Sequence, residues 1–233
     1  MLTAAYVLHQ RDWLETSRIL EIFSREFGRL GLVARGLRRA KSTLKPVLRP
    51  FQPLLLSWTG NGELPILVSA ESTSMSHPLT GDVLMSGYYL NELLLRLMPR
   101  HDPQPVLYDQ YEKTLEQLVI RPAAALRIFE KHLLQTLGYG LNLEWEADTG
   151  KPLDSGASYY YVPDHGPERV QNSATPGLPV SGDTLLALAR GELRNPEHLR
   201  DARRILHEAI QRLLGNKPLK TKTVMQSLHK INT

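Results

Sequence analysis

Apolar residues in the first part of the chain follow the alternating pattern of β-strands. In the segment 29–35, for example, every second residue is apolar, as expected where one face of a strand packs inward. Gly28 supplies a turn, and the pair Asn61-Gly62 is a strong hairpin signal. The sequence predicts five strands, at residues 4–9, 17–24, 29–35, 53–59 and 64–71. Five strands in about 70 residues fit a small oligonucleotide-binding (OB) barrel, although other five-stranded barrels have the same count.

Near residue 80 the spacing of apolar residues becomes helical. Val83, Leu90 and Leu97 repeat on one helix face, and Asn195 and Pro196 form a typical helix start. This spacing predicts helices at residues 83–97, 105–120, 122–137, 182–191 and 195–214.

The segment 144–182 lacks a helical period and is rich in Pro, Gly, Ser and Asp, which predicts an irregular connection with at most a small hairpin. We therefore expect an α+β fold. An N-terminal five-stranded OB-fold barrel at residues 1–77 precedes a mainly α-helical domain at residues 78–233, which includes this irregular segment without cysteine.

Composition narrows the class of protein. Hydrophobic residues make up 42% of the 233 residues and charged residues 22%, which excludes a wholly disordered chain. No apolar run approaches the roughly 20 residues of a membrane-spanning helix, and no signal peptide is recognisable. The absence of cysteine excludes disulfides, thiolate nucleophiles and cysteine-ligated zinc. We expect a cytoplasmic protein that does not contact membranes.

The distribution of charge is more informative than the net charge of +4. Both ends of the chain are basic and the middle is acidic, which indicates that particular surfaces contact a polyanion. Residues 29–49 contain seven basic residues and no acidic residue. Cations that neutralise phosphates gain affinity because they release counterions. The predicted DNA contacts after the third strand are Arg35, Arg38, Arg39, Lys41, Lys45 and Arg49.

A second basic cluster lies near the C-terminus. It consists of Lys217, Lys220 and Lys222. Phosphate contacts and an ordinary solvated terminus explain it equally well. The aromatic residues of the first domain also leave two alternatives open, because they can stack on bases or fill the barrel core. These residues are Tyr6, Trp13, Phe51 and Trp58.

No recognisable catalytic motif is present. The sequence lacks a G-x-x-x-x-G-K-[ST] phosphate loop and a G-x-S-x-G nucleophile elbow. His207-Glu208 begins an H-E-x-x-H zinc motif, but Gln211 stands where the second histidine is required. We therefore expect no catalytic residue, no metal and no cofactor, and a protein that is not an enzyme.

Short motifs spread over nearly the whole chain resemble those of the bacterial recombination mediator RecO. The motifs are Tyr6-Val7-Leu8, Glu15-Thr16-Ser17, Ala34-Arg35-Gly36, Pro50-Phe51, Leu90-Asn91-Glu92-Leu93, Phe129-Glu130, Leu137-Gly138-Tyr139-Gly140 and Lys217-Pro218-Leu219-Lys220. The resemblance implies an OB barrel followed by a helical domain. It also implies a nucleoid-associated protein that binds single- and double-stranded DNA and anneals complementary strands. Such a protein acts with RecR to load RecA onto DNA coated by single-strand-binding protein, in gap repair.

The resemblance further implies a docking site for the acidic, apolar C-terminal tail of single-strand-binding protein. The candidate residues are Arg127, Lys131, Leu134 and Tyr139. We expect the head group of Arg127 to reach solvent, and an ion pair with Glu130 is the alternative. Many family members carry a four-cysteine zinc module in the helical domain. The corresponding segment here, 144–182, has no cysteine, so no zinc is expected.

Two other classes of function remain open from the residues alone. One is an RNA-binding or transcription-associated OB-fold module with no role in repair. The other is a scaffold whose basic loops contact acidic proteins only. Preference for structured RNA over single-stranded DNA would favour the first, and behaviour that is unchanged by DNA would favour the second.

Overall fold

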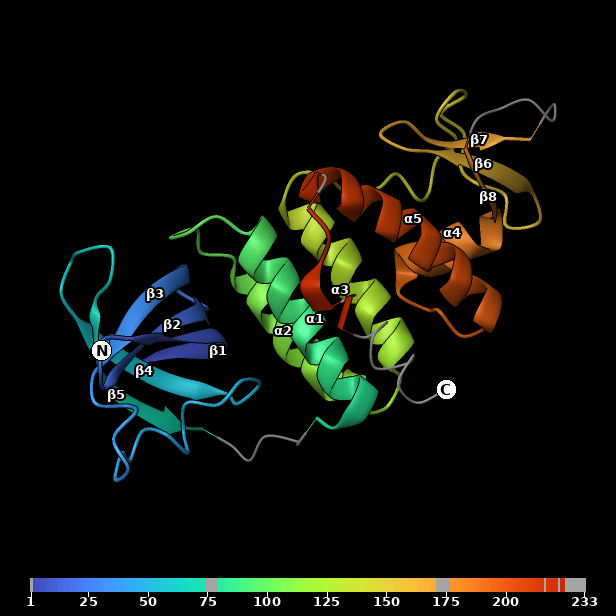
Figure 1. Ribbon diagram of the computed structural model, residues 1–233. Coiled ribbons are helices and arrows are strands. Elements are labelled where there is room, and N and C mark those ends of the chain that lie inside the picture. Colours follow the sequence, from blue (N-terminus) through green and yellow to red (C-terminus); the bar gives the residue numbers. More distant parts are fainter. Residues whose placement is uncertain (1, 74–78, 171–176, 216, 222, 225–233) are drawn as a thin grey trace. The chain divides into compact units, whose positions relative to one another are not determined.

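The computed structural model describes residues 2–73, 79–170, 177–215, 217–221 and 223–224 (Figure 1). Contacts divide the chain into two compact units. The first comprises Met1–Val119 and Pro218–Thr233, and the second comprises Ile120–Lys217. The second unit is thus inserted into the first. The predicted domain boundary after residue 77 lies outside the described residues and stays a prediction.

Five strands of the first unit close into a barrel, which confirms the predicted OB architecture. They are β1 (Thr3–Trp13), β2 (Ser17–Ser24), β3 (Gly28–Ala34), β4 (Leu54–Thr59) and β5 (Ile66–Ser72). Their order around the barrel is β1-β2-β3-β5-β4, and only β3 and β5 of these neighbours pair in parallel. β1 extends four residues past its predicted end. It pairs with β2 from Ala5–Ser24 to Trp13–Ser17, so the two strands form a long hairpin, with one register shift between Val7 and His9.

The barrel core contains side chains from outside the strands. Leu20, Leu32 and Leu56 are fully buried, as expected for inward positions of strands. Leu37 and Leu48 belong to the connection between β3 and β4, yet each is only 2% exposed and packs in the same core. The basic connection is therefore fixed to the barrel at two points.

Two helices of the first unit pack against the barrel: α1 (Gly81–Leu97) and α2 (Pro105–Leu118). The Tyr6 ring lies 5.6 Å from that of Tyr108 and 5.1 Å from that of Tyr111. Burial raises the pKa of Tyr6, so its hydroxyl stays protonated and donates to a Glu112 carboxylate oxygen at 2.9 Å. Asn91 of α1 donates to the Leu8 carbonyl at 2.9 Å.

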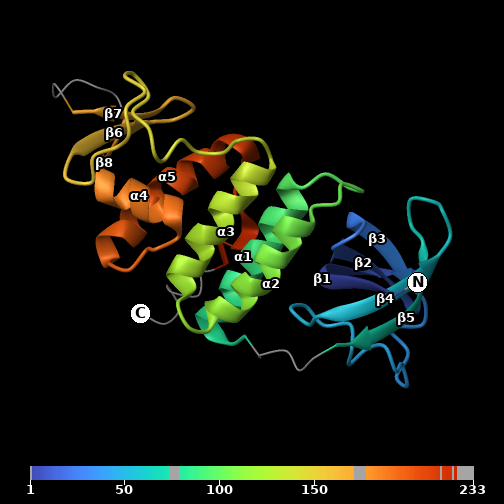
Figure 2. The same cartoon turned by 180° about the vertical axis from the view of Figure 1, so that it is seen from behind.

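The second unit combines three helices with a small sheet (Figure 2). Its elements are α3 (Pro122–Thr136), β6 (Ser158–Val162), β7 (Gly166–Arg169), β8 (Leu178–Ser181), α4 (Gly182–Arg190) and α5 (Pro196–Leu214). The sheet has the order β7-β6-β8. The small hairpin allowed in the segment 144–182 is present as β6 and β7, whereas the third strand, β8, was not predicted. This short strand escaped notice because it carries no long alternating pattern.

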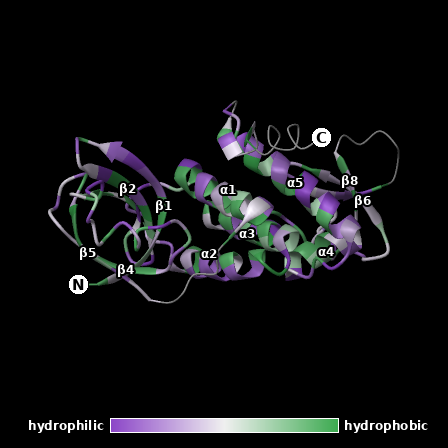
Figure 3. Ribbon diagram, turned by 60° about the horizontal axis from the view of Figure 1, so that its bottom comes forward, coloured by the Kyte–Doolittle hydropathy of each residue, from purple (hydrophilic) through white to green (hydrophobic). Residues whose placement is uncertain are grey.

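The helix start predicted at Asn195 is confirmed. Its side-chain oxygen accepts a hydrogen bond from the His198 backbone N–H at 2.8 Å, as an N-cap does. Hydrophilic and hydrophobic residues alternate along α5 (Figure 3), as expected for a helix with one buried face. Among the helices in the described ranges, none is both long and apolar enough to cross a membrane.

We expect Asn91→Leu to lower the free energy of unfolding by about 2–4 kcal/mol, because Asn91 serves two buried groups. It donates to the Leu8 carbonyl and accepts from the Tyr111 hydroxyl at 2.6 Å. Urea unfolding followed by circular dichroism measures the change. Glu116→Gln, at an exposed position of α2, is the control and should change stability by less than about 0.5 kcal/mol. Equal stabilities for the two variants would contradict this role of Asn91.

Candidate nucleic-acid interface

The connection between β3 and β4 exposes a group of cations on the barrel. Because Leu37 and Leu48 point into the core, the charged residues beside them point outward. Five are exposed and have no acidic partner within the described part of the chain. They are Arg35, Arg39, Lys41, Lys45 and Arg49. We call these five residues the basic loop cations; all five are among the predicted DNA contacts.

Arg38 differs from its neighbours because it is engaged within the protein. Its guanidinium lies 3.6 Å from the Asp12 carboxylate and donates to the Leu14 carbonyl at 3.3 Å. Its backbone N–H donates to the Thr16 carbonyl at 2.9 Å. Arg38 thus ties the basic loop to the tip of the β1–β2 hairpin. Its side chain is nevertheless 40% exposed, so Arg38 stays a predicted DNA contact in addition to this positioning role.

Arg29, the first cation of the acid-free segment, is also engaged. Its guanidinium pairs with Glu21 at 3.2 Å and donates to the Met98 carbonyl at 3.0 Å. Burial lowers the pKa of Arg29, and the Glu21 carboxylate opposes this shift. Arg100 pairs with the same carboxylate. These contacts hold the barrel against the segment after α1 and leave Arg29 outside the interface.

The aromatic residues of the barrel have different roles. Tyr6 and Phe51 are 2% and 8% exposed, so they are packing residues. Trp58 packs edge-on against Phe27, with ring centroids 5.2 Å apart. Trp13 at the end of the β1–β2 hairpin is 39% exposed, and the Arg11 guanidinium lies 5.8 Å from its ring. Sequence reasoning did not single out Arg11, because it stands apart from the basic run.

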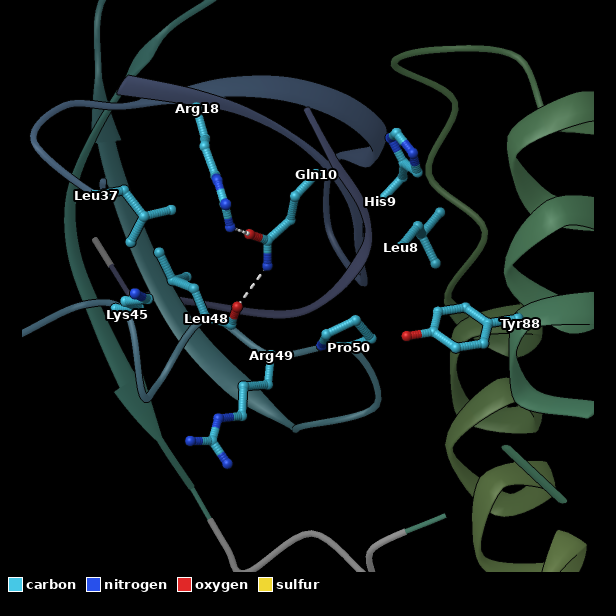
Figure 4. A pocket seen from close by; sticks show the side chains of 10 residues that line it. All are labelled: Leu8, His9, Gln10, Arg18, Leu37, Lys45, Leu48, Arg49, Pro50 and Tyr88. Atoms are coloured by element: carbon cyan, nitrogen blue, oxygen red, sulfur yellow. Dashed lines mark hydrogen bonds between the residues drawn. The ribbon is translucent and has the colours of Figure 1, made fainter. Parts of the chain in front are cut away.

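A pocket of about 470 Å³ opens between β1, the basic loop and α1 (Figure 4). Leu37 and Leu48 contribute apolar surface, and Lys45 and Arg49 contribute cations. Gln10 crosses the pocket: its amide group donates to the Leu48 carbonyl and accepts from Arg18 at 3.2 Å. The pocket therefore combines an apolar lining with positive charge.

The side of the pocket opposite Lys45 is lined by Tyr88, which belongs to α1, and by His9, which belongs to β1 (Figure 4). The hydroxyl of Tyr88 points toward Pro50 (Figure 4). Sequence reasoning missed both residues, because only the packing of α1 beside the barrel brings Tyr88 to the loop.

The segment that carries the C-terminal basic cluster also makes structural contacts with α1. Leu219 is 2% exposed, and the backbone N–H groups of Lys220 and Thr221 donate to the Glu92 carboxylate at 2.8 and 2.9 Å. Lys217 and the side chain of Lys220 are exposed. Lys222 lies outside the described residues. The cluster is thus anchored on α1 through its backbone.

The prediction that the Arg127 head group reaches solvent was wrong. Arg127 is only 9% exposed, and its guanidinium pairs with Glu130, which is 2% exposed. The alternative, an ion pair with Glu130, is therefore correct, although it is buried and not on the surface. The reason is that α3 buries residues around a wide arc, which includes Leu134 as well as Phe129 and its apolar stripe.

Of the remaining predicted tail-binding residues, one is exposed. Tyr139 is 56% exposed, whereas Leu134 is fully buried. Lys131 is half-buried and donates to the carbonyls of Leu188 and Ala189, at 3.1 and 2.7 Å, at the end of α4. Burial lowers the pKa of Lys131. The structure therefore does not bring the four side chains together on an open surface.

The small sheet is held by a polar cluster. Glu146 is 4% exposed and accepts from Thr149 and from the Tyr159 hydroxyl at 3.3 Å. The Arg169 guanidinium lies 3.6 Å from the same carboxylate. Tyr159 also accepts from the Asp154 backbone N–H at 2.9 Å. Within the described ranges, no group of three or more histidines and carboxylates is arranged to hold a metal ion.

Comparison with known sequences identifies the family. Residues 1–75 match the model of the "Recombination protein O N terminal" family, and residues 79–223 match "Recombination protein O C terminal". Proteins named "DNA repair protein RecO" are similar along almost their whole length. The one from Nitrosococcus oceani is 44% identical over 233 residues, which cover 99% of this chain and 95% of that protein. The one from Alkalilimnicola ehrlichii is 47% identical over 226 residues, covering 96% and 90%.

The chain belongs to the RecO family of DNA repair proteins. The expected resemblance is therefore confirmed. The RecO N-terminal match covers the barrel with its basic loop, and the C-terminal match begins just before α1. By contacts, however, α1 and α2 belong with the barrel.

We expect Arg127→Ala to lower the free energy of unfolding by about 3–5 kcal/mol, because it removes the arginine that pairs with the buried Glu130 carboxylate. Thermal and urea unfolding measure this loss. Arg203→Ala is the matched control, since Arg203 is an exposed arginine of α5 in the same unit. It should change stability by less than about 0.5 kcal/mol. If Arg127→Ala is as stable as the control, the ion pair is not structural.

We expect the small sheet to need no metal. Tyr159→Phe should lower the free energy of unfolding by about 1–3 kcal/mol, because it removes the hydroxyl that accepts from the Asp154 N–H. A chelator should leave the melting temperature unchanged. Tyr160→Phe is the control, because the neighbouring residue points to the other face of β6. Stoichiometric zinc by elemental analysis, or a lower melting temperature in chelator, would overturn this expectation.

Proposed function

We propose that this protein binds single- and double-stranded DNA through the basic loop of its OB barrel and anneals complementary strands. It acts with RecR and single-strand-binding protein to load RecA in gap repair. The observation that carries the proposal is the group of five exposed basic loop cations, which are fixed to the barrel by Leu37 and Leu48.

Annealing brings two polyanions together, so phosphate repulsion opposes it. Fixed cations lower that repulsion, and they gain affinity from the release of counterions. Preorganisation matters because a loop that is already ordered loses little conformational entropy when it binds. No covalent chemistry is needed for this role, so the protein acts as a mediator and not as an enzyme.

The proposed docking of the acidic tail of single-strand-binding protein belongs to the second unit. Tyr139 is the exposed member of the predicted set and is the residue to test by substitution. Arg127 and Leu134 support this region from within the core and are not proposed as direct contacts. Lys217 and Lys220 remain proposed as additional phosphate contacts, since their side chains are exposed. Lys222 is proposed with them on its sequence alone.

Strand annealing on DNA coated with the cognate single-strand-binding protein tests the proposed function. Two labelled complementary strands are coated, and duplex formation is followed with and without the protein. We expect faster annealing with the protein, and a further effect of RecR on RecA loading. Tight binding of structured RNA with no annealing of DNA would instead favour the RNA-binding alternative.

DNA binding should depend strongly on salt. If the five basic loop cations each neutralise one phosphate of a single strand, log K falls against log salt with a slope near −3.5. The triple variant Arg35→Ala, Arg39→Ala, Lys41→Ala leaves two of these cations, so its slope should flatten to about −1.4. Fluorescence anisotropy with a labelled oligonucleotide over a range of salt concentrations measures both slopes.

A matched control removes the same charge elsewhere. Arg190, Arg194 and Arg203 are exposed arginines of the second unit, and their triple alanine variant should keep the slope of the wild type. The same slope in both triple variants would show that the barrel loop is not the phosphate-binding surface.

A further inference from the structure

The pocket beside the basic loop has an aromatic ring whose position is set by packing. Tyr88 packs edge-on against Phe51, with ring centroids 5.2 Å apart, and remains 38% exposed. Phe51 has a φ of 65°, which is a strained conformation for a non-glycine residue. A side chain at Gly87 would lie 2.9 Å from the Phe51 ring, so the glycine permits this contact. Backbone strain and a close approach thus fix the ring at the pocket edge.

The cations of the pocket are positioned by one turn of backbone. The Leu48 N–H donates to the Leu44 carbonyl at 2.9 Å, which closes a helical turn. Lys45 lies within this turn and Arg49 directly follows it, and both residues line the pocket. Both are exposed and have no acidic partner among the residues that the structure describes. Their charge is therefore available to an anion.

Arg18, the third cation of the pocket, has a different role. It pairs with Asp12 at 3.0 Å and donates to Gln10, which in turn is bonded to the Leu48 carbonyl. These contacts hold the far wall of the pocket. The positive charge that remains free is therefore concentrated at Lys45 and Arg49.

The pocket also has an apolar lining. Pro50 lies between Arg49 and Tyr88, whereas Leu37 and Leu48 lie beside Lys45 (Figure 4). Its volume of about 470 Å³ is within the range of small-ligand sites, which is roughly 300–1,000 Å³. Cations for a phosphate, an aromatic ring for a base and apolar lining in one pocket match the parts of one nucleotide.

We propose that this pocket binds one unstacked nucleotide of a single DNA strand, with its base against Tyr88 and its phosphates at Lys45 and Arg49. The proposal rests on the DNA-binding function proposed above and deepens it. A base inside a duplex is paired and stacked, so it reaches the pocket only after it leaves the stack, which costs free energy. The pocket therefore favours single strands, whereas the remaining basic loop cations contact phosphates of either form.

The test separates bases from phosphates. An oligo-dT strand is compared with an abasic strand of the same length, which keeps the sugars and phosphates but has no bases. Binding is measured for the full-length wild type, Tyr88→Ala and Tyr88→Phe. Tyr88→Ala should weaken binding of oligo-dT roughly fivefold to a hundredfold, and should barely change binding of the abasic strand. Tyr88→Phe retains the ring and should bind oligo-dT nearly as the wild type does.

One control variant and one variant without the pocket cations complete the experiment. Phe27→Ala removes an exposed aromatic residue from the β2–β3 turn, at the opposite end of the barrel from the β1–β2 hairpin. It should leave both affinities unchanged. The double variant Lys45→Ala, Arg49→Ala should weaken binding of both strands and flatten both salt slopes. Tyr88→Ala should preserve the salt slope, because the phosphate contacts remain.

The outcomes distinguish this proposal from the function on which it rests. If the wild type binds neither strand, the proposed DNA-binding function fails. If the wild type binds both but Tyr88→Ala binds oligo-dT normally, no base occupies the pocket. An equal loss on both strands would show that Tyr88 supports the fold only. If Tyr88→Ala instead loses affinity for an acidic, apolar peptide while oligo-dT binding is unchanged, the occupant is a protein tail.

Discussion

Burial of Leu37 and Leu48 in the barrel core is the constraint on which the basic surface depends. A long connection rich in Arg and Lys would otherwise be solvated, and ordering it on DNA would cost conformational entropy. Burying a leucine contributes about 1.5–3 kcal/mol. Two such anchors offset the cost of ordering the loop before any ligand arrives. The cations near these anchors, among them Arg39 and Arg49, are exposed.

Some of the cations form ion pairs with acidic residues of the barrel, and the others have no such partner among the described residues. Asp12 engages Arg18 and Arg38, and Glu21 engages Arg29. Each pair joins two segments: Asp12 ties the basic loop to the β1–β2 hairpin, and Glu21 ties the barrel to the chain after α1. The cations without such partners keep their full charge for phosphates. A count of basic residues along the sequence does not show which of them form ion pairs within the protein, because these pairs depend on the fold.

The sequence predicted the barrel well because period-two patterns and turn signals are local. It failed where burial depends on several neighbours at once. On α3 the charged residues Arg127 and Glu130 are buried together with Leu134, since this helix is covered over a wide arc. On α5 the polar residues His198 and Asp201 are buried beside Ile205, which a pattern of apolar residues does not indicate. Tyr88 of the pocket was missed because only the packing of α1 beside the barrel brings it near the basic loop.

The C-terminal motif shows why charge alone is an incomplete guide. Its lysines suggested phosphate contacts, but its backbone also makes structural contacts. One carboxylate, Glu92, accepts from the N–H groups of Lys220 and Thr221, and Arg96 donates to the Pro218 carbonyl at 3.0 Å. These bonds, together with the buried Leu219, return the chain to α1 after the inserted second unit. The backbone of this basic segment therefore helps to close the fold, and its charge is not the only reason for its place in the chain.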